Sequence, residues 1–280
     1  MKITKNIILE GKHGKPILTD VFYVENKKPK PIIVFCHGYK GFKDWGAWNL
    51  MAEAFAKTGF YFIKFNFSHN GGTVVQPIDF PDLEAFGNNN YTKELDDLET
   101  VIDWLYANNK IKKEGDVNNI NLIGHSRAGG IVTIKAEEDS RITKVISLAG
   151  VCDFGARTSN KGDLEQWKND GVKYVLNGRT KQQMPHYYQF YEDFIANEER
   201  LSIKRAVSNL KIPYLIIHGD DDTSVLIDEA YSLHKWNKKS CLEIIEGANH
   251  VFSASHPWKK DSLPKELKIV IKKTTAFIKD

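Results

Sequence analysis

Apolar and polar positions near the N-terminus alternate, and further along the chain they give way to unbroken apolar runs. Residues 6–24 contain two alternating segments around a glycine-bounded turn at 11–14, which predicts an antiparallel hairpin. Residues 31–36 are apolar throughout, the pattern of a strand that is buried on both faces. This part of the chain therefore predicts a peripheral hairpin followed by a strand of a parallel sheet.

After residue 36 the pattern alternates between helix-like and strand-like segments. The expected helices lie at about 45–58, 92–107 and 127–138, and the expected strands at 60–67, 120–123 and 144–149. The pattern resumes with a strand at 213–218, a helix at 226–236, a strand at 242–245 and a closing helix at 263–278. Repeated units of this kind predict an α/β fold with an open, mostly parallel sheet and helices on both faces.

Residues 152–210 interrupt the alternation with helical, aromatic-rich sequence. Tyr187, Phe190, Tyr191 and Phe194 have the i, i+3, i+4, i+7 spacing of one helix face. We expect this segment to be a helical cap inserted into a single domain that spans residues 1–280.

The composition and charge of the chain indicate which kinds of binding partner to expect. Hydrophobic residues make up 41% and charged residues 27%, which is ordinary for a globular protein with a large core. The net charge is only +3 and the lysines are scattered, so we expect neither nucleic acid nor an anionic membrane as a partner. The basic stretch at 27–30 is interpreted as a solvated loop between two strands.

Targeting signals and cysteines bear on location. No apolar run approaches membrane-spanning length, and the N-terminus leads directly into a strand-like segment, so we expect a cytoplasmic location. Cys36, Cys152 and Cys241 lie in or beside apolar runs, which predicts buried, reduced thiols.

The run from Gly124 to Gly129 is Gly-His-Ser-Arg-Ala-Gly, a Gly-x-Ser-x-x-Gly variant of the Gly-x-Ser-x-Gly motif with Ser126 as its serine. A predicted strand precedes it and a predicted helix follows, which is the context that a nucleophilic serine on a sharp turn requires. Glycines two residues before and three after relieve contacts across the turn, and the helix start can stabilise developing negative charge. A glycine-rich bend with a capping serine is the structural alternative.

A serine nucleophile needs a base, and downstream residues supply one in the expected order. Asp220, Asp221 and Asp222 follow the strand at 213–218, at the edge where open α/β sheets build their sites. His250 follows the next strand. Ser126, then an aspartate, then His250 is the chain order of a serine hydrolase triad on this type of sheet. No histidine has a companion at metal-ligand spacing, so neither a metal nor another cofactor is expected.

These motifs resemble the α/β-hydrolase superfamily over nearly the whole chain. In that family the acid usually takes the fourth place of a Gly-x-x-Asp-x-x-Val run, which implies Asp222 here, with Asp153 as the alternative because some relatives place their acid there. The segment 36–41 looks like the oxyanion loop of the family, which implies that the backbone N–H groups of Tyr39 and Arg127 stabilise an oxyanion. His37 is then expected to orient this loop by hydrogen bonds.

Within the superfamily the pattern is most similar to small esterases of the cinnamoyl-esterase and dienelactone-hydrolase-like groups. The resemblance lies in His37-Gly38, in residues 65–68 and in residues 246–252. Two differences are plain: dienelactone hydrolases proper use a cysteine nucleophile, and Arg127 stands where many of the esterases have glutamine.

The resemblance implies a serine carboxylic-ester hydrolase that acts on a small-molecule ester without a cofactor. The alternatives are a peptidase or amidase of the prolyl-oligopeptidase-like type with the same triad, and a non-catalytic ligand receptor on the same fold. Most aromatic residues of the cap are expected to pack it onto the main domain. The competing hypothesis is that Trp167, Tyr187 and Tyr188 line a substrate pocket above Ser126.

Overall fold

The computed structural model describes residues 1–159 and 164–280, so that part of the predicted cap, residues 160–163, lies outside the described residues. The main sheet contains β1 (Lys2–Glu10), β2 (Pro16–Tyr23), β3 (Lys30–Cys36), β4 (Tyr61–Phe65), β5 (Gly115–His125), β6 (Ile142–Leu148), β9 (Tyr214–Gly219) and β10 (Cys241–Ile245). Their spatial order is β1-β2-β4-β3-β5-β6-β9-β10. The β1–β2 and β2–β4 pairs are antiparallel and the other pairs are parallel. The predicted α/β fold and its N-terminal hairpin are confirmed.

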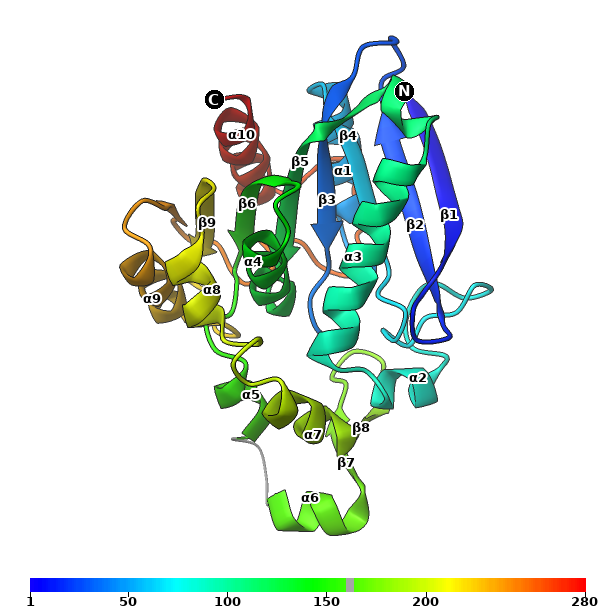
Figure 1. Cartoon of the computed structure of the whole chain (residues 1–280), viewed down its shortest axis with the longest axis vertical. Helices are drawn as coiled ribbons and strands as arrows, with labels where there is room; N and C mark the ends of the chain where they lie inside the picture. The colour runs from blue at the N-terminus through cyan, green and yellow to red at the C-terminus, as the bar shows by residue number, and fades with distance from the viewer. Residues whose placement is uncertain (160–163) are drawn as a thin grey trace.

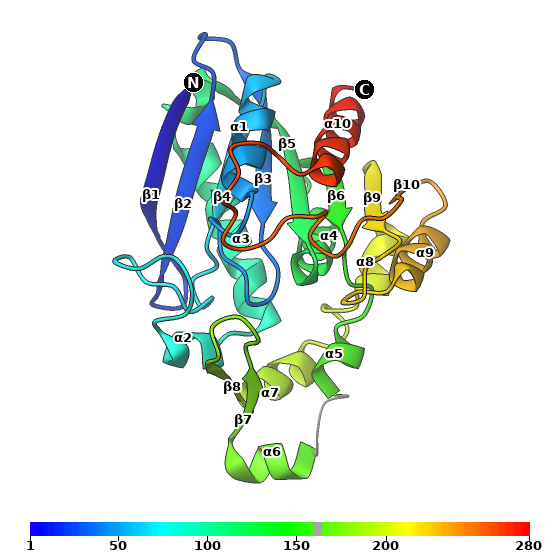
Figure 2. The same ribbon diagram turned by 180° about the vertical axis from the view of Figure 1, so that it is seen from behind.

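Helices cover both faces of this sheet (Figures 1 and 2). One face carries α3 (Tyr91–Ala107), α4 (Arg127–Glu138), α8 (Ile203–Asn209) and α9 (Ile227–Trp236), and the other carries α1 (Trp48–Lys57) and α10 (Lys265–Lys279). This arrangement explains why β3 is apolar throughout. Ile32 and Val34 belong to the core under α3 and α4. Ile33 and Phe35 belong to the core under α1 and α10. Side chains of a strand point alternately to its two faces, so a strand between two helix layers has to be apolar throughout.

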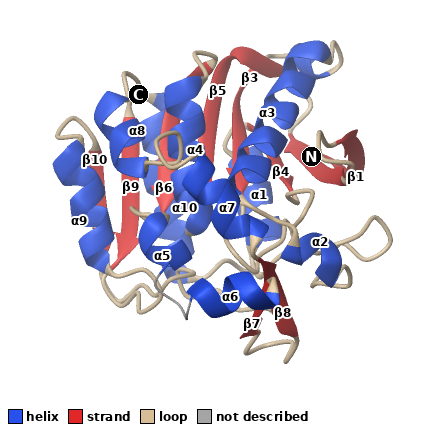
Figure 3. Cartoon of the chain, turned by 60° about the horizontal axis from the view of Figure 1, so that its bottom comes forward, coloured by secondary structure: helices blue, strands red, loops and turns tan. Residues whose placement is uncertain are grey.

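Residues 152–159 and 164–196 lie beyond the carboxyl ends of the parallel strands, whereas α8, at the end of the segment 152–210, packs on the sheet face (Figures 1 and 3). The segment contains α5 (Gly155–Ser159), α6 (Leu164–Asp170), β7 (Val172–Leu176), β8 (Gln183–Tyr187) and α7 (Gln189–Ala196), followed by α8. The expectation of a helical cap is wrong in part, because β7 and β8 form an antiparallel hairpin between its helices. Pro185 disfavours a helix at this position because it has no backbone N–H to donate. Residues 183–187 can instead pair with β7 as a strand. Tyr187 consequently ends a strand and does not share a helix face with Phe190.

Smaller features complete the fold. The long connection after β4 contains α2 (Leu83–Gly87), and the 3-10 helix η1 (Ile111–Lys113) precedes β5. Cys36 is buried, but Cys241 is exposed at the start of the edge strand β10, so the prediction of burial is wrong for that thiol. Within the described part of the chain, no helix combines the length and the apolar character needed to cross a membrane.

Candidate active site

Ser126 lies on a strained turn between β5 and α4. Its backbone has φ 58° and ψ −122°, a region that a residue with a side chain occupies only when its surroundings enforce it. The Ser126 N–H donates to the carbonyl of Leu148 at 2.9 Å, which ties the turn to the end of β6. A Cβ atom at Gly124 would lie 2.1 Å from the carbonyl oxygen of Ala128, so the turn excludes any side chain there. The turn therefore holds Ser126 at the carboxyl edge of the sheet.

His250 and Asp222 meet Ser126 from two loops that follow β10 and β9. The Nε2 atom of His250 lies 3.0 Å from Oγ of Ser126, and its Nδ1 atom lies 2.7 Å from Oδ2 of Asp222. The other oxygen of Asp222 accepts the N–H groups of Ser224 and Val225. Asp153, in contrast, is exposed and its Oδ1 accepts the N–H of Gly155 at the start of α5. The structure thus brings together the serine, the histidine and Asp222.

The environment of Asp222 favours its ionised form. Burial acts to raise its pKa, but contacts with His218 and His250 and the N–H of Val225 outweigh this effect and hold the pKa of Asp222 well below its usual range. A carboxylate at this position fixes the ring orientation of His250 and leaves Nε2 to face Ser126.

The loop after β3 passes directly beside Ser126. A Cβ atom at Gly38 would lie 2.8 Å from Cβ of Ser126, so only glycine lets the loop come this close. His37 accepts the N–H of Phe67 on Nε2 at 3.3 Å, and burial lowers the pKa of His37 to about 4, which keeps the ring neutral. In the described residues the N–H of Tyr39 meets no acceptor, and the N–H of Arg127, as the first of α4, has no acceptor within the helix.

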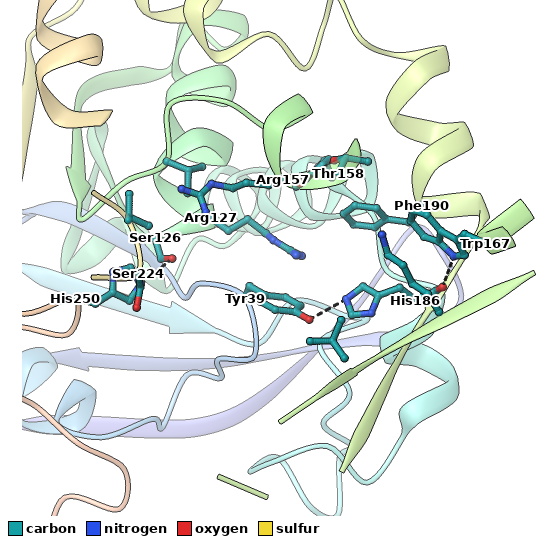
Figure 4. A pocket seen from close by; sticks show the side chains of 15 residues that line it. Tyr39, Ser126, Arg127, Arg157, Thr158, Trp167, His186, Phe190, Ser224 and His250 are labelled. Carbon is teal, nitrogen blue, oxygen red and sulfur yellow. Dashed lines mark hydrogen bonds between the residues drawn. The ribbon is translucent and has the colours of Figure 1, made fainter. Parts of the chain in front are cut away.

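Two cavities meet at Ser126. The larger has a volume of about 350 Å³ and extends toward the segment 152–210 (Figure 4). The smaller, of about 160 Å³, lies between the loop after β3 and Trp45, Trp48 and Val251. Tyr39, Ser126 and His250 line both cavities. A substrate with two portions on either side of its reacting bond can therefore occupy both.

The three predicted pocket residues have different positions. Trp167 lines the larger cavity and donates from Nε1 to the carbonyl of His186 at 2.8 Å. Tyr187 and Tyr188 are not among the lining residues: the Tyr187 hydroxyl donates to Glu84, and the Tyr188 ring packs edge-on against Trp167.

Other residues that line the larger cavity were not identified from the sequence. Tyr91, Arg157 and Lys173 line the larger cavity from α3, α5 and β7, and His186 and Phe190 line it from β8 and α7. No motif links these elements, although His186 and Phe190 stand in the aromatic run of the predicted cap. Among the described side chains, no group of three or more His, Cys, Asp or Glu residues is placed to hold a metal ion.

Comparison with known proteins agrees with the fold. Residues 31–182 match the family described as alpha/beta hydrolase fold, which confirms the resemblance seen in the motifs. The chain is 24% identical over 216 residues to the uncharacterized peptidase YtmA of Bacillus subtilis (strain 168), and the match covers 76% of this chain and 74% of the relative.

Solved structures share this architecture. The structure of Est1E from Butyrivibrio proteoclasticus with bound ferulic acid has a TM-score of 0.75 and 18% identity, and 97% of each chain is covered. A puromycin-hydrolyzing peptidase of Mycobacterium tuberculosis has a TM-score of 0.64 and 17% identity, with 99% of this chain and 39% of that chain covered. At these identities the likeness concerns the fold.

Proposed function

Because the chain belongs to the alpha/beta hydrolase fold family, we propose that it is a serine hydrolase that cleaves carboxylic esters through an acyl-enzyme on Ser126. The observation that carries this proposal is the continuous set of contacts from Asp222 through His250 to Ser126, at 2.7 and 3.0 Å. The cavities on both sides of Ser126 give an ester room for its acyl and alcohol portions.

Each of the three residues has a role in the proposed reaction. His250 takes the proton of Ser126 at Nε2 while Oγ attacks the ester carbonyl carbon, and Asp222 stabilises the imidazolium that forms. The C–O bond to the alcohol then breaks, and His250 returns the proton to the leaving oxygen. Water attacks the acyl-enzyme next, with His250 again as the base, and releases the acid and Ser126.

The N–H groups of Tyr39 and Arg127 would stabilise the oxyanion of the tetrahedral intermediates. Neither is engaged by a described acceptor or by a helix bond, and the close passage of Gly38 keeps the loop beside Ser126. One such donor contributes about 3 kcal/mol to the stability of a transition state. The larger cavity would take the acyl portion, since the segment 152–210 supplies seven of its 15 lining residues and would shield the acyl-enzyme.

A peptidase or amidase activity is the second candidate. The relative YtmA is described as a peptidase, and amides pass through the same tetrahedral intermediate as esters. Comparing kcat/KM for aryl esters and aminoacyl anilides separates the two candidates, because only a peptidase cleaves the anilides at a comparable rate.

The experiment that tests the proposal combines a fluorophosphonate probe with an aryl acetate assay. Wild-type protein is expected to be labelled and to turn over the ester, and Ser126→Ala is expected to lose both. Ser208→Ala, which removes a hydroxyl from the exposed face of α8, serves as the matched control and should retain both. Labelling or full turnover by Ser126→Ala would refute the proposal. Ligand binding without labelling of the wild type would favour a receptor.

A further inference from the structure

The side chain of Arg127 projects into the larger cavity, and three aromatic rings hold it. Its Cζ atom lies 4.4 Å from the ring centroid of Tyr39, 5.4 Å from that of Tyr91 and 5.6 Å from that of Phe190. Figure 4 shows the side chain extending from beside Ser126 toward His186. The rings stabilise the charge and fix the direction of the guanidinium, so its position does not depend on a ligand.

Few of the Arg127 donors are used inside the protein. A guanidinium has five N–H donors, and the acceptor available to this one among the described side chains is Oε1 of Glu94, at 3.3 Å. The Arg127 side chain is only 13% exposed, so its remaining donors face the cavity and not bulk solvent. Glu94 pairs with the charge, but N–H donors inside a cavity that lack an acceptor are costly, and a ligand in the cavity can supply acceptors for them.

Two further cations line the same cavity. Lys173 lies with Nζ 3.4 Å from the ring centroid of Trp167, and Arg157 pairs with Glu229. No Asp or Glu is among the described residues of the cavity wall. Burial, together with the charges of Arg127 and Lys173, lowers the pKa of His186 to about 3, so this wall residue is neutral and does not add to the charge. The ionisable groups that line the larger cavity are therefore basic or neutral, while Glu94 and Glu229, which pair with two of the cations, are not lining residues.

We propose that this hydrolase prefers esters whose acyl portion carries a carboxylate, and that the Arg127 guanidinium binds that carboxylate in the larger cavity. The planar guanidinium can donate two parallel hydrogen bonds to a carboxylate, a geometry that a lysine ammonium does not match. A neutral acyl chain of the same length would leave those donors without a charged acceptor. This inference rests on the proposed function and names its substrate class.

The test compares two esters of the same shape with purified full-length protein. The 4-nitrophenyl monoester of adipic acid carries a carboxylate, and the 4-nitrophenyl ester of adipamic acid carries a neutral amide in its place. Wild type is expected to favour the carboxylate in kcat/KM by about 10- to 100-fold, the range of a hydrogen bond to a charged group. Arg127→Met should bring the ratio close to one, and Arg127→Lys should give an intermediate ratio.

A matched control and a thermal melt separate specificity from folding. Arg179→Met removes an arginine that pairs with Asp79 and is not among the lining residues of the larger cavity, so it should keep the wild-type ratio. Melting curves of all variants establish that they are folded. If wild type hydrolyses both esters equally, the carboxylate proposal is overturned while the hydrolase proposal stands. A preference for 4-carboxyphenyl hexanoate over 4-carbamoylphenyl hexanoate, with no preference between the adipic esters, also overturns it.

A binding experiment tests the carboxylate site even if the protein hydrolyses no ester. In that case the proposed function fails, and calorimetry with Ser126→Ala compares adipamate, which has a carboxylate, with the neutral diamide of adipic acid. Tighter binding of adipamate that is lost in Ser126→Ala/Arg127→Met supports the carboxylate site. Equal binding of the two compounds overturns it.

Discussion

Both oxygens of Asp222 are held, since Oδ2 lies 2.7 Å from Nδ1 of His250 and Oδ1 accepts the N–H of Val225 at 2.9 Å. The carboxylate therefore cannot rotate without losing a hydrogen bond. Asp222→Asn places an amide N–H against either Nδ1–H or a backbone N–H, which disturbs the tautomer of His250. We expect kcat for an aryl acetate to fall by about 10³- to 10⁴-fold, measured by steady-state kinetics.

Asp153→Asn is the control for that change. Asp153 is exposed and accepts N–H groups at the start of α5, contacts that an asparagine oxygen can also make. We expect kcat to stay within about twofold of wild type, because surface substitutions of this kind are nearly neutral. A large loss in Asp153→Asn with an active Asp222→Asn would mean that the acid has been assigned to the wrong residue.

Gly38→Ala tests the loop that would carry an oxyanion donor. The added Cβ would lie 2.8 Å from Cβ of Ser126 and 3.0 Å from the carbonyl oxygen of His125, so the loop has to move away from the serine. The N–H of Tyr39 would move with it, and kcat should fall by about 10²- to 10³-fold, the effect of losing one oxyanion donor. Gly178→Ala, where a Cβ meets nothing within 4 Å, should leave kcat unchanged. Wild-type kcat in Gly38→Ala would contradict the role of the loop.

The features that the sequence predicts well are those that local constraints determine. The apolar run at residues 32–35 predicts a strand that is buried on both faces. Each face of β3 contacts its own helix layer, so both faces have to be apolar. The turn at Ser126 is recognisable because its constraints act within six residues. Strand and helix order then predicts which loops meet at the carboxyl edge, and Asp222 and His250 lie on those loops.

The cavity wall could not be predicted in the same way, because its residues come together only through tertiary packing. Tyr91, Arg157 and Lys173 are separated in the chain, and none lies in a recognisable motif. Tyr187 satisfies a helical spacing, yet pairing between β7 and β8 places it on a strand, with its hydroxyl on Glu84. The spacing of apolar residues depends on one segment alone. It contains no information on whether a second segment can pair with that segment as a strand.

Buried charges are a second feature that local patterns do not reveal, and Lys64 offers a test. Its side chain is fully buried in β4, and Nζ lies 2.8 Å from Asp20 and 2.7 Å from Asp44, both of which also contact Lys43. Lys64→Met leaves the buried Asp20 with Lys43 as its one cation, and the partly buried Asp44 with Lys43 and, at 3.9 Å, Lys5. We expect the free energy of unfolding to fall by about 3–5 kcal/mol, measured by urea denaturation.

The matched control for this change is Lys57→Met, which removes an exposed lysine whose Nζ lies 3.5 Å from Glu53. Its effect on the free energy of unfolding should stay below about 1 kcal/mol. If Lys64→Met cost no more than Lys57→Met, the buried network would contribute nothing to stability.

The buried carboxyl group of Asp97 on α3 makes the free energy of unfolding depend on pH. Its Oδ2 accepts the N–H of Ser68 at 2.7 Å, and its buried Oδ1 has no hydrogen-bond partner in the described residues. Burial raises the pKa of Asp97 to about 7, and the hydrogen bond from Ser68 only partly opposes this. The folded protein therefore holds a proton at Asp97 at a pH where the unfolded chain has lost it.

This difference determines the sign of the pH dependence. Between about pH 4 and pH 7 the folded state binds the extra proton, so the contribution of Asp97 to the free energy of unfolding falls as pH rises, by at most about 1.4 kcal/mol per pH unit. Asp97→Asn removes this contribution and keeps an oxygen for the Ser68 N–H. Urea denaturation at several pH values should show that the free energy of unfolding of Asp97→Asn, minus that of wild type, increases from pH 4 to pH 7 and is constant above. Asp103→Asn, which removes an exposed carboxylate from the same helix, controls for the change in net charge. A difference for Asp97→Asn that stays flat from pH 4 to pH 7 would show that Asp97 is already ionised in the folded protein at low pH.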